Sequence, residues 1–542
     1  MYSFCRFKVI DEGTHFWHSH TGVQRGDGLF GAFIVREPTD VHEGLYDFDL
    51  PEHVIFINSW YNELTINKFN SFYHAEMAVF PDSLLINDLL KNIKYVIILS
   101  RKIDSFIFIN FRKGKGRYKE FQAPNTNDSS FTPYEVFNVE LGRRYRFRLI
   151  NNAVANCAVQ FSVDNHTLVV IASDGNAFEK IDVESLNVFA GERYDIVLTA
   201  DQSVANYWIR VRGLGLCQNS NAFQQAIIHY KGASMENPDG PSGYWHGART
   251  GKKLNPMNSK TTEDLISVVS LDSKQPTNDP ALKETPDKKF YIVMDFNPIH
   301  FLKYHHPKYY PFPLPVPPKG GIDAAQINCI TNIRPPAPLL TQYHDVPQEE
   351  FCNADTIKQN CTEDFCECVH MIKVGLGETV EFVMIDEGKR YSSAHPMHLH
   401  GQYFRVVGMD KVSTSYYVVF NVSMINNALN TTVSVEHVME LDKQGLLQRN
   451  LTNPPLKDTV TTQDGGYTIV RFLADNPGFW FFHCHVQLHQ NNGMSMIIQV
   501  GELNQMPKPP KNFPQCRPWN FSGFQEPSGP SNNICTSGKQ II

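Results

Sequence analysis

WFFHCHVQLHQNNGM, residues 480–494, places a cysteine between two histidines at the end of an aromatic run. The run predicts an extended strand, in which neighbouring side chains point to opposite faces of the sheet. His483 and His485 are therefore expected to face one way and Cys484 the other way. This alternation predicts two different metal centres back to back, joined by the few covalent bonds of one residue.

The residues that follow Cys484 supply further candidate ligands for the same site. His489 lies five positions later and Met494 ten positions later, so one segment offers a soft thiolate, an imidazole and a weak thioether. One more histidine would complete the trigonal arrangement with a long axial methionine that is typical of blue-copper sites. The alternative is a buried core cysteine with incidental neighbours, which leaves the spacing unexplained.

A second cluster, HPMHLH at residues 395–400, supplies that histidine. His398 and His400 share one face of a strand, whereas His395 is offset from them by an odd number of residues. His395 is therefore expected to turn away from the other two and to complete the site of Cys484.

The third cluster is WHSH at residues 17–20. His18 and His20 again share a face and are interpreted as metal ligands. His15 lies three positions before His18 and points off that face, so we interpret it as a structural or supporting residue.

Short β-branched and aromatic runs such as YRFRLINN, YDIVLTA and YTIVRFLA, separated by Gly, Pro and Asn, predict an all-β chain of sandwiches or barrels. Length alone favours several packed units. We expect these parts: a short β-like segment at 1–40, a strand-rich unit at 45–232, a linker at 233–285, a second strand-rich unit at 286–505, a tail at 506–542, and an unusual Ile/Phe/Lys run at 89–113 inside the first unit.

Composition excludes several classes of protein. With 42% hydrophobic and 19% charged residues the chain is globular, and its formal charge of -7 gives no reason to expect nucleic acid or an acidic membrane surface as a partner. Apolar runs also fall short of the 18 or so residues of a membrane-spanning helix. The sequence does not indicate an oligomeric state.

The cysteines and glycosylation motifs indicate an oxidising compartment. Four of the eleven cysteines crowd into FCNADTIKQNCTEDFCEC at 351–368, which could hold zinc or form disulfides; the spacing lacks paired CxxC motifs and favours disulfides. Cys516 and Cys535 are candidates to anchor the C-terminal tail through disulfides. Together with the Asn-X-Ser/Thr motifs, this predicts a secreted glycoprotein, although no signal peptide is visible. The motifs begin at Asn127, Asn165, Asn360, Asn421, Asn430, Asn450 and Asn520.

The three histidine motifs resemble those of the multicopper oxidases: laccases, ascorbate oxidases and ferroxidases. Phrases such as GTHFWHSH, FAGERYDIVL, NPPLKDTV and RFLADNPGFWFFHCH are most similar to arthropod laccases. The resemblance implies tandem cupredoxin-like domains, two complete at 45–232 and 286–505, and a remnant of a first domain at 1–40.

The resemblance also implies the copper ligands. The type 1 ligands would be His395, Cys484 and His489, with Met494 axial, and His398 would hold the type 2 copper. His20, His400 and His483 would complete one ion of the type 3 pair, and His18 and His485 would share the other.

The sequence departs from the family in lacking the first motif, HWHG. Without it the type 2 copper has one imidazole from this chain, and the site is expected to be weak or vacant. We expect an incomplete N-terminus, with a naturally truncated protein as the alternative. Residues 89–113 would then be a translated intron, since deleting them joins PDSLLIN to GKGRY in a phrase like that of the family; the alternative is an extra hairpin.

The expected function is that of a laccase-like oxidoreductase, and the missing first histidine motif leaves the activity of this copy an open question. It would take single electrons from a small phenol, such as a catechol, at the type 1 copper, pass them through Cys484 to His483 and His485, and reduce dioxygen to water at the trinuclear cluster. Three alternatives remain: a ferroxidase or ascorbate oxidase, a non-catalytic protein that binds type 1 copper, and a structural β-sandwich protein.

Overall fold

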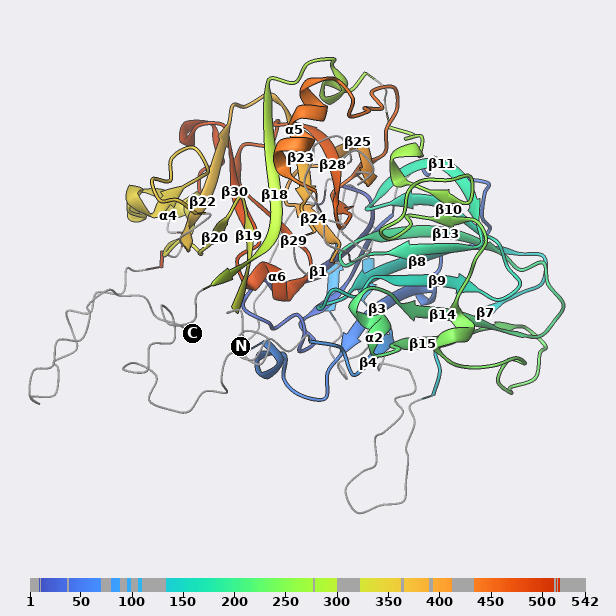
Figure 1. Cartoon of the computed structure of the whole chain (residues 1–542). Coiled ribbons are helices and arrows are strands. Elements are labelled where there is room, and N and C mark those ends of the chain that lie inside the picture. Colours follow the sequence, from blue (N-terminus) through green and yellow to red (C-terminus); the bar gives the residue numbers. More distant parts are fainter. Residues whose placement is uncertain are drawn as a thin grey trace, which may run out of the picture.

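The structure is a computed structural model that describes most of the chain. Side chains are described for residues 9, 11–36, 39–69, 79–87, 133–275, 278–297, 323–361, 365–388, 393–411, 433–510, 513 and 515–516. It consists of two lobes of β-sheet that lie against each other (Figure 1). The predicted all-β class is confirmed.

The first lobe is a sandwich of two sheets. The six-stranded sheet runs, in spatial order, through β11 (Asn176–Val183), β10 (Leu168–Ser173), β13 (Arg193–Thr199), β8 (Arg144–Asn152), β3 (Val54–Trp60) and β4 (Ser83–Ile86). The seven-stranded sheet runs through β17 (Leu265–Ile266), β16 (Lys253–Leu254), β12 (Ser185–Val188), β9 (Val159–Val163), β14 (Asn206–Gly213), β15 (Phe223–Tyr230) and β7 (Val136–Val139). Helix α2 (Leu216–Asn219) follows β14. Fully buried apolar residues of both sheets, among them Leu149 and Ile209, form one core.

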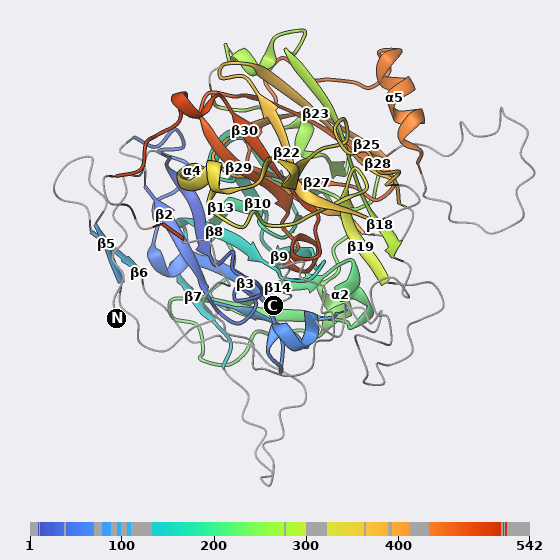
Figure 2. The same ribbon diagram turned by 90° about the vertical axis from the view of Figure 1, so that its left-hand side faces the viewer.

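The second lobe is a continuous sheet of thirteen strands within the described residues. Its path runs through β26 (Leu456–Lys457), β25 (Phe404–Lys411), β28 (Gly466–Leu473), β23 (Thr379–Asp386), β18 (Lys288–Ile299), β19 (Ile322–Ile327), β20 (Ile330–Asn332), β22 (Cys366–Val374), β30 (Ser495–Val500), β29 (Gly478–Cys484), β24 (His395–Leu399) and β27 (Thr459–Thr462), with β21 (Phe351–Cys352) paired to β22. Helices α4 (Leu339–Gln342), α5 (Val435–Lys443) and α6 (Gln487–Asn491) lie outside the sheet (Figures 1 and 2).

An antiparallel hairpin of β1 (Gly13–His18) and β2 (Phe30–Val35) packs on the first lobe beside the second. Phe16 and Phe30 pack against Phe56 and Ile150 of the six-stranded sheet. The hairpin carries the WHSH motif, so this contact brings the first histidine cluster to the junction of the two lobes.

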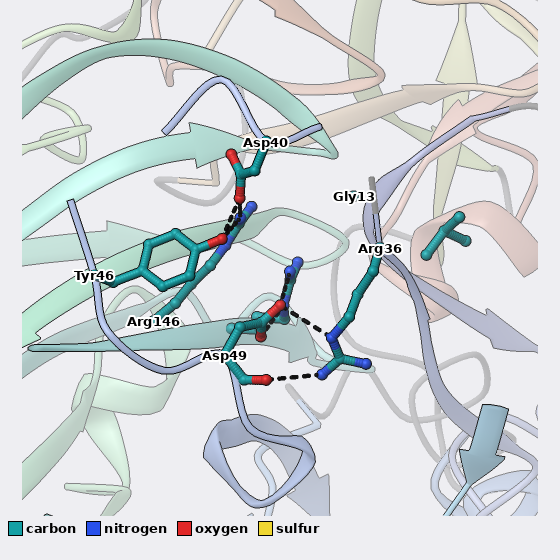
Figure 3. A pocket seen from close by; sticks show the side chains of 8 residues that line it. Gly13, Arg36, Asp40, Tyr46, Asp49 and Arg146 are labelled. Carbon is teal, nitrogen blue, oxygen red and sulfur yellow. Dashed lines mark hydrogen bonds and ion pairs between the residues drawn. The ribbon is translucent and has the colours of Figure 1, made fainter. Parts of the chain in front are cut away.

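The polar base of the hairpin borders a cavity of about 250 Å³ (Figure 3). Its charged side chains pair with one another: Arg36 and Arg148 with Asp49, and Arg146 with Asp40. Buried charges are stable only when they are paired in this way. The cavity therefore contains an anchor between hairpin and sheet, and none of the predicted ligands lines it.

Two segments bear on the division into strand-rich units and a linker that the sequence suggested. The stretch 233–285, expected to be a linker, contributes β16 and β17 to the seven-stranded sheet and pairs with β12 through Lys253 and Leu254. Within 89–113, only the backbones of β5 (Tyr95–Ile98) and β6 (Phe106–Ile109) are described, and they form an antiparallel hairpin. The rest of this run lies outside the described residues, and its interpretation as an intron stays a prediction.

Three disulfides lie within the described part of the chain. Cys352–Cys368 and Cys361–Cys366 confirm the predicted disulfide cluster. Cys157–Cys217 joins the connection between β8 and β9 to helix α2 in the first lobe. It was not predicted, because both cysteines are isolated in the sequence. Cys516 is exposed and unbridged, and Cys535 lies outside the described residues. Among the described helices, none has the length and apolarity required to cross a bilayer.

Candidate metal centre

The thiol of Cys484 lies against two imidazoles in the second lobe. Its Sγ is 3.8 Å from Nδ1 of His395 and 3.6 Å from Nδ1 of His489, and the two nitrogens are 3.3 Å apart. These three ligand atoms form a group small enough to surround one ion. Met494 is fully buried, and its carbonyl accepts a hydrogen bond from the Cys484 backbone at 3.1 Å.

Strand pairing and a tight turn build this site. Strand β24 pairs with β29 in a register that sets Met397 opposite Cys484 and His398 opposite His483. After Cys484 the chain forms α6, which brings His489 back to the thiol. Gly493 then turns the chain into β30 with φ +115°, and a Cβ there would lie 2.4 Å from Thr331, so only glycine fits.

Burial sets the protonation of this site in the absence of metal. It lowers the pKa of His395 to about 3 and raises the pKa of the Cys484 thiol to about 12. It also holds the pKa of His489 well below its ordinary value, with a further contribution from His395. The imidazoles are therefore neutral, which is the form that binds metals, and the thiol would release its proton to an incoming ion.

The opposite face of β29 holds a cluster of six imidazoles from three segments. Ring centroids are 4.6 Å apart for His18 and His20, 5.2 Å for His18 and His485, 4.9 Å for His20 and His400, 5.2 Å for His400 and His483, and 5.5 Å for His398 and His485. The Nε2 atoms of His400 and His483 approach to 3.1 Å. One group of three, His20, His400 and His483, has its ligand atoms close enough to share an ion.

Backbone carbonyls orient several of these rings. Nδ1 of His18 donates to the Ser19 carbonyl at 3.1 Å, and Nδ1 of His483 donates to the Cys484 carbonyl at 2.8 Å. Each bond uses Nδ1–H and leaves Nε2 as the nitrogen with a free lone pair. Burial lowers the pKa of His18 and His20 to about 2 and keeps the pKa of His400, His483 and His485 well below the ordinary value.

Two neighbours of His485 were not anticipated from the sequence. Nη1 of Arg25 donates to Nδ1 of His485 at 2.8 Å, and Nη2 donates to the His485 carbonyl at 2.8 Å. Gly191, with φ +86°, lies against the same ring, where a Cβ would lie 2.5 Å from Cγ. Both contacts were missed because Arg25 and Gly191 are distant from His485 in the sequence. The segments that contain them, QRGDG and FAGERY, resemble those of the family.

The structure thus brings all ten predicted ligands into two groups on either face of residue 484. His15 stays outside both and bonds through Nε2 to the Glu12 carbonyl at 3.0 Å. A thiolate with two imidazoles and a nearby methionine fits type 1 copper, and clustered neutral imidazoles fit further copper ions. Site and sheets together define a copper protein of cupredoxin-like construction.

Comparison with known proteins agrees with this class. Three segments, residues 3–40, 51–233 and 332–504, match family models described as multicopper oxidase. The chain belongs to the multicopper oxidase family. It is an oxidoreductase whose cofactors are copper ions of types 1, 2 and 3.

Similar proteins include Laccase-2 of Agaricus bisporus, 28% identical over 500 residues that cover 91% of this chain and 71% of the relative. Laccase-5 of Trametes villosa is 27% identical over 503 residues, with the same coverage. Among solved structures, the laccase from Botrytis aclada has a TM-score of 0.58 at 22% identity, covering 92% of this chain and 71% of the other. Fet3p, described as a multicopper oxidase that functions in iron import, has a TM-score of 0.58 at 18% identity over 90% of this chain and 72% of its own.

Proposed function

We propose that this protein is a laccase-like oxidase that takes single electrons from diphenols at the Cys484 site and reduces dioxygen to water at the six-histidine site. His395, Cys484, His489 and Met494 would hold the type 1 copper, and His398 the type 2 copper. His18, His20, His400, His483 and His485 would hold the type 3 pair. When bound, copper supplies reversible one-electron redox chemistry, which amino-acid side chains lack.

The connection between the two groups is the observation that carries this proposal. Cys484 belongs to one group through its sulfur, and its backbone neighbours His483 and His485 belong to the other. The Cys484 carbonyl also accepts the hydrogen bond from Nδ1 of His483 at 2.8 Å. A covalent path and a hydrogen-bonded path therefore run from the thiolate to the opposite imidazoles, through residues that are at most 2% exposed.

A cavity near His395 suits a small aromatic substrate. It has a volume of about 630 Å³ and is lined by loops of the first lobe that include Leu214, Met257 and Asn258. Leu214 and Met257 pack against a buried cluster that contains Ala394, the residue before His395. Apolar walls with a few amide groups are typical of small-molecule sites. This supports a phenolic substrate on the His395 side of the centre.

The choice of substrate separates the proposal from a ferroxidase or an ascorbate oxidase. Oxygen uptake by the copper-loaded chain would be measured with catechol, ascorbate and ferrous iron at matched concentrations. We expect the highest kcat/KM with catechol and no uptake by a Cys484→Ser variant. A higher kcat/KM with ferrous iron would make it a ferroxidase, and blue absorption without oxygen uptake would make it a copper carrier.

We also propose that the protein works outside the cell. Its three disulfides support this location, because such bonds persist in oxidising compartments and are rare in the cytosol. Asn165 and Asn360, which begin glycosylation motifs, are exposed. Secretion of glycosylated protein from a eukaryotic expression host would be the expected result, and retention of unmodified protein in the cytosol would contradict it.

A further inference from the structure

A buried ion pair joins the two lobes directly beside the six-histidine cluster. Arg193 begins β13 of the first lobe, and Asp458 precedes β27 of the second. Nη1 and Nη2 of Arg193 each donate to one carboxylate oxygen of Asp458, both at 2.6 Å. The residues are 3% and 8% exposed. This planar, two-pronged geometry is the most directional form of charge-assisted hydrogen bond.

Asp458 and the residue after it surround Nδ1 of His398. The Asp458 carbonyl lies 2.9 Å from Nδ1, the Thr459 hydroxyl oxygen lies 3.0 Å from it, and the Asp458 carboxylate lies 3.5 Å from it. The Thr459 hydroxyl donates its proton to the Asp458 carboxylate at 2.8 Å. Its oxygen is therefore left as an acceptor for Nδ1–H, and the ring is held with Nε2 as the nitrogen available to a metal.

Arg193 holds this carboxylate in place beside His398, because each of its two terminal nitrogens donates to one carboxylate oxygen. Arg193 is fixed in turn, since it donates to the Gly191 carbonyl at 3.1 Å and to the Thr14 carbonyl at 3.1 Å. Gly191 packs on His485, so the same arginine braces a second ring of the cluster.

We propose that Arg193 and Asp458 act together as positioning residues for His398, so that copper binding at this imidazole depends on an ion pair between the two lobes. The inference rests on the proposed role of His398 as a type 2 copper ligand. Supporting residues that fix a histidine ligand raise metal affinity by lowering the cost of ordering the ring and choosing its tautomer.

The first test uses the copper-free protein with ¹⁵N-labelled histidine. In the wild type, NMR of the imidazole nitrogens should show His398, assigned by its loss in His398→Asn, as a single Nδ1–H tautomer. Asp458→Asn and Arg193→Met should each produce a mixture of tautomers. If both variants keep the single tautomer of the wild type, the backbone carbonyl alone fixes the ring and the proposal fails.

The second test measures copper. Type 2 copper, followed by its EPR signal during titration against a chelator, should bind about 10 to 100 times more weakly in each variant, the usual effect of losing such a support. The double variant should be no weaker than either single one, because the two residues act as a unit. The blue type 1 band should persist in all three. Unchanged affinity, or losses that add in the double variant, would overturn the proposal.

Arg210→Met is the matched control. Arg210 lies in β14 of the seven-stranded sheet, is buried, and forms a two-pronged ion pair with Asp164 instead of with a residue beside the cluster. Arg210→Met should lower stability as Arg193→Met does and leave both the tautomer and the EPR signal unchanged. If Arg210→Met alters them equally, the effect of Arg193 is a general consequence of losing a buried ion pair.

His398→Asn separates this inference from the proposed function beneath it. If His398→Asn leaves the type 2 signal intact, the ligand assignment itself is wrong. If His398→Asn abolishes the signal while Asp458→Asn and Arg193→Met preserve it, the assignment stands and only the positioning role is refuted.

Discussion

The two candidate copper groups differ in how many parts of the molecule supply their ligands, although they lie on opposite faces of the same residue, Cys484. All four residues of the thiolate group follow residue 394 and lie in one lobe, and each is at most 5% exposed. The six-histidine group draws on three segments, two of them in the second lobe and one on a hairpin packed against the first, and His18, His20, His398 and His400 are partly exposed. A site within one folded unit should therefore tolerate changes elsewhere, whereas a site at a junction should depend on how the lobes meet.

The largest effect is expected from replacing Cys484, which binds in one group and connects it to the other. Cys484→Ser should abolish the blue absorption band and reduce oxidase activity to background, because a hydroxyl cannot replace the soft thiolate. Absorption spectroscopy and oxygen uptake on copper-loaded protein would show this. Retention of the band would mean that another sulfur binds the copper.

His400→Gln should separate the two groups. Its imidazole contacts His483 and His20 on the far side of β29, so the blue band should remain while oxygen uptake falls by more than about 100-fold, the upper range for supporting residues alone. The enzyme should still accept one electron per blue copper from catechol without oxygen. Loss of the blue band as well would contradict the independence of the thiolate group.

Gly191→Ala should perturb the junction without replacing a ligand. Its positive φ should cost about 1–3 kcal/mol of stability, and the clash of the new Cβ with His485 adds a similar amount. Gly142→Ala is the control, because Gly142 has φ +80° and open space around its Cβ position. The melting temperature should fall further for Gly191→Ala, with oxygen uptake impaired in that variant alone. Equal effects in both would show that the contact with His485 is unimportant.

The pH dependence of the copper-free protein gives the smallest effect. Folded His395 stays neutral down to about pH 3, whereas the unfolded chain protonates it below pH 6.5. Acid therefore stabilises the unfolded state, and stability is lost as pH falls from 6.5, by about 1.4 kcal/mol per pH unit for this ring. His395→Gln should have a shallower slope by one proton in chemical denaturation. An unchanged slope would mean that the ring titrates normally when folded.

Much of the thiolate group was predictable because Cys484, His489 and Met494 lie close in sequence, and because strand alternation separates His395 from His398 and His400. His395, offset by three from His398, does turn to Cys484, as the parity argument requires. The same argument predicted the shared faces of His398 with His400 and of His18 with His20. The all-β class followed from the strand pattern, and the cysteine cluster forms the disulfides that its spacing favoured.

What escaped prediction depends on contacts between distant segments. Arg193 and Asp458 are 265 residues apart, and nothing in ERYDI or LKDTV pairs them before the lobes are placed. Arg25 reaches His485 across 460 residues. The short strands β16 and β17 were taken for linker because two-residue strands carry no alternation to detect. The resemblance to arthropod laccases and the domain boundaries stay predictions.

Copper-loaded crystals measured at the copper absorption edge would test the central claim most directly. The account predicts an anomalous peak bonded to Sγ of Cys484 and Nδ1 of His395 and His489, and separate copper density among the imidazoles across β29. Copper density confined to one face of residue 484 would contradict it. So would a Cys484 sulfur that binds no copper and instead forms a disulfide or stays a free thiol.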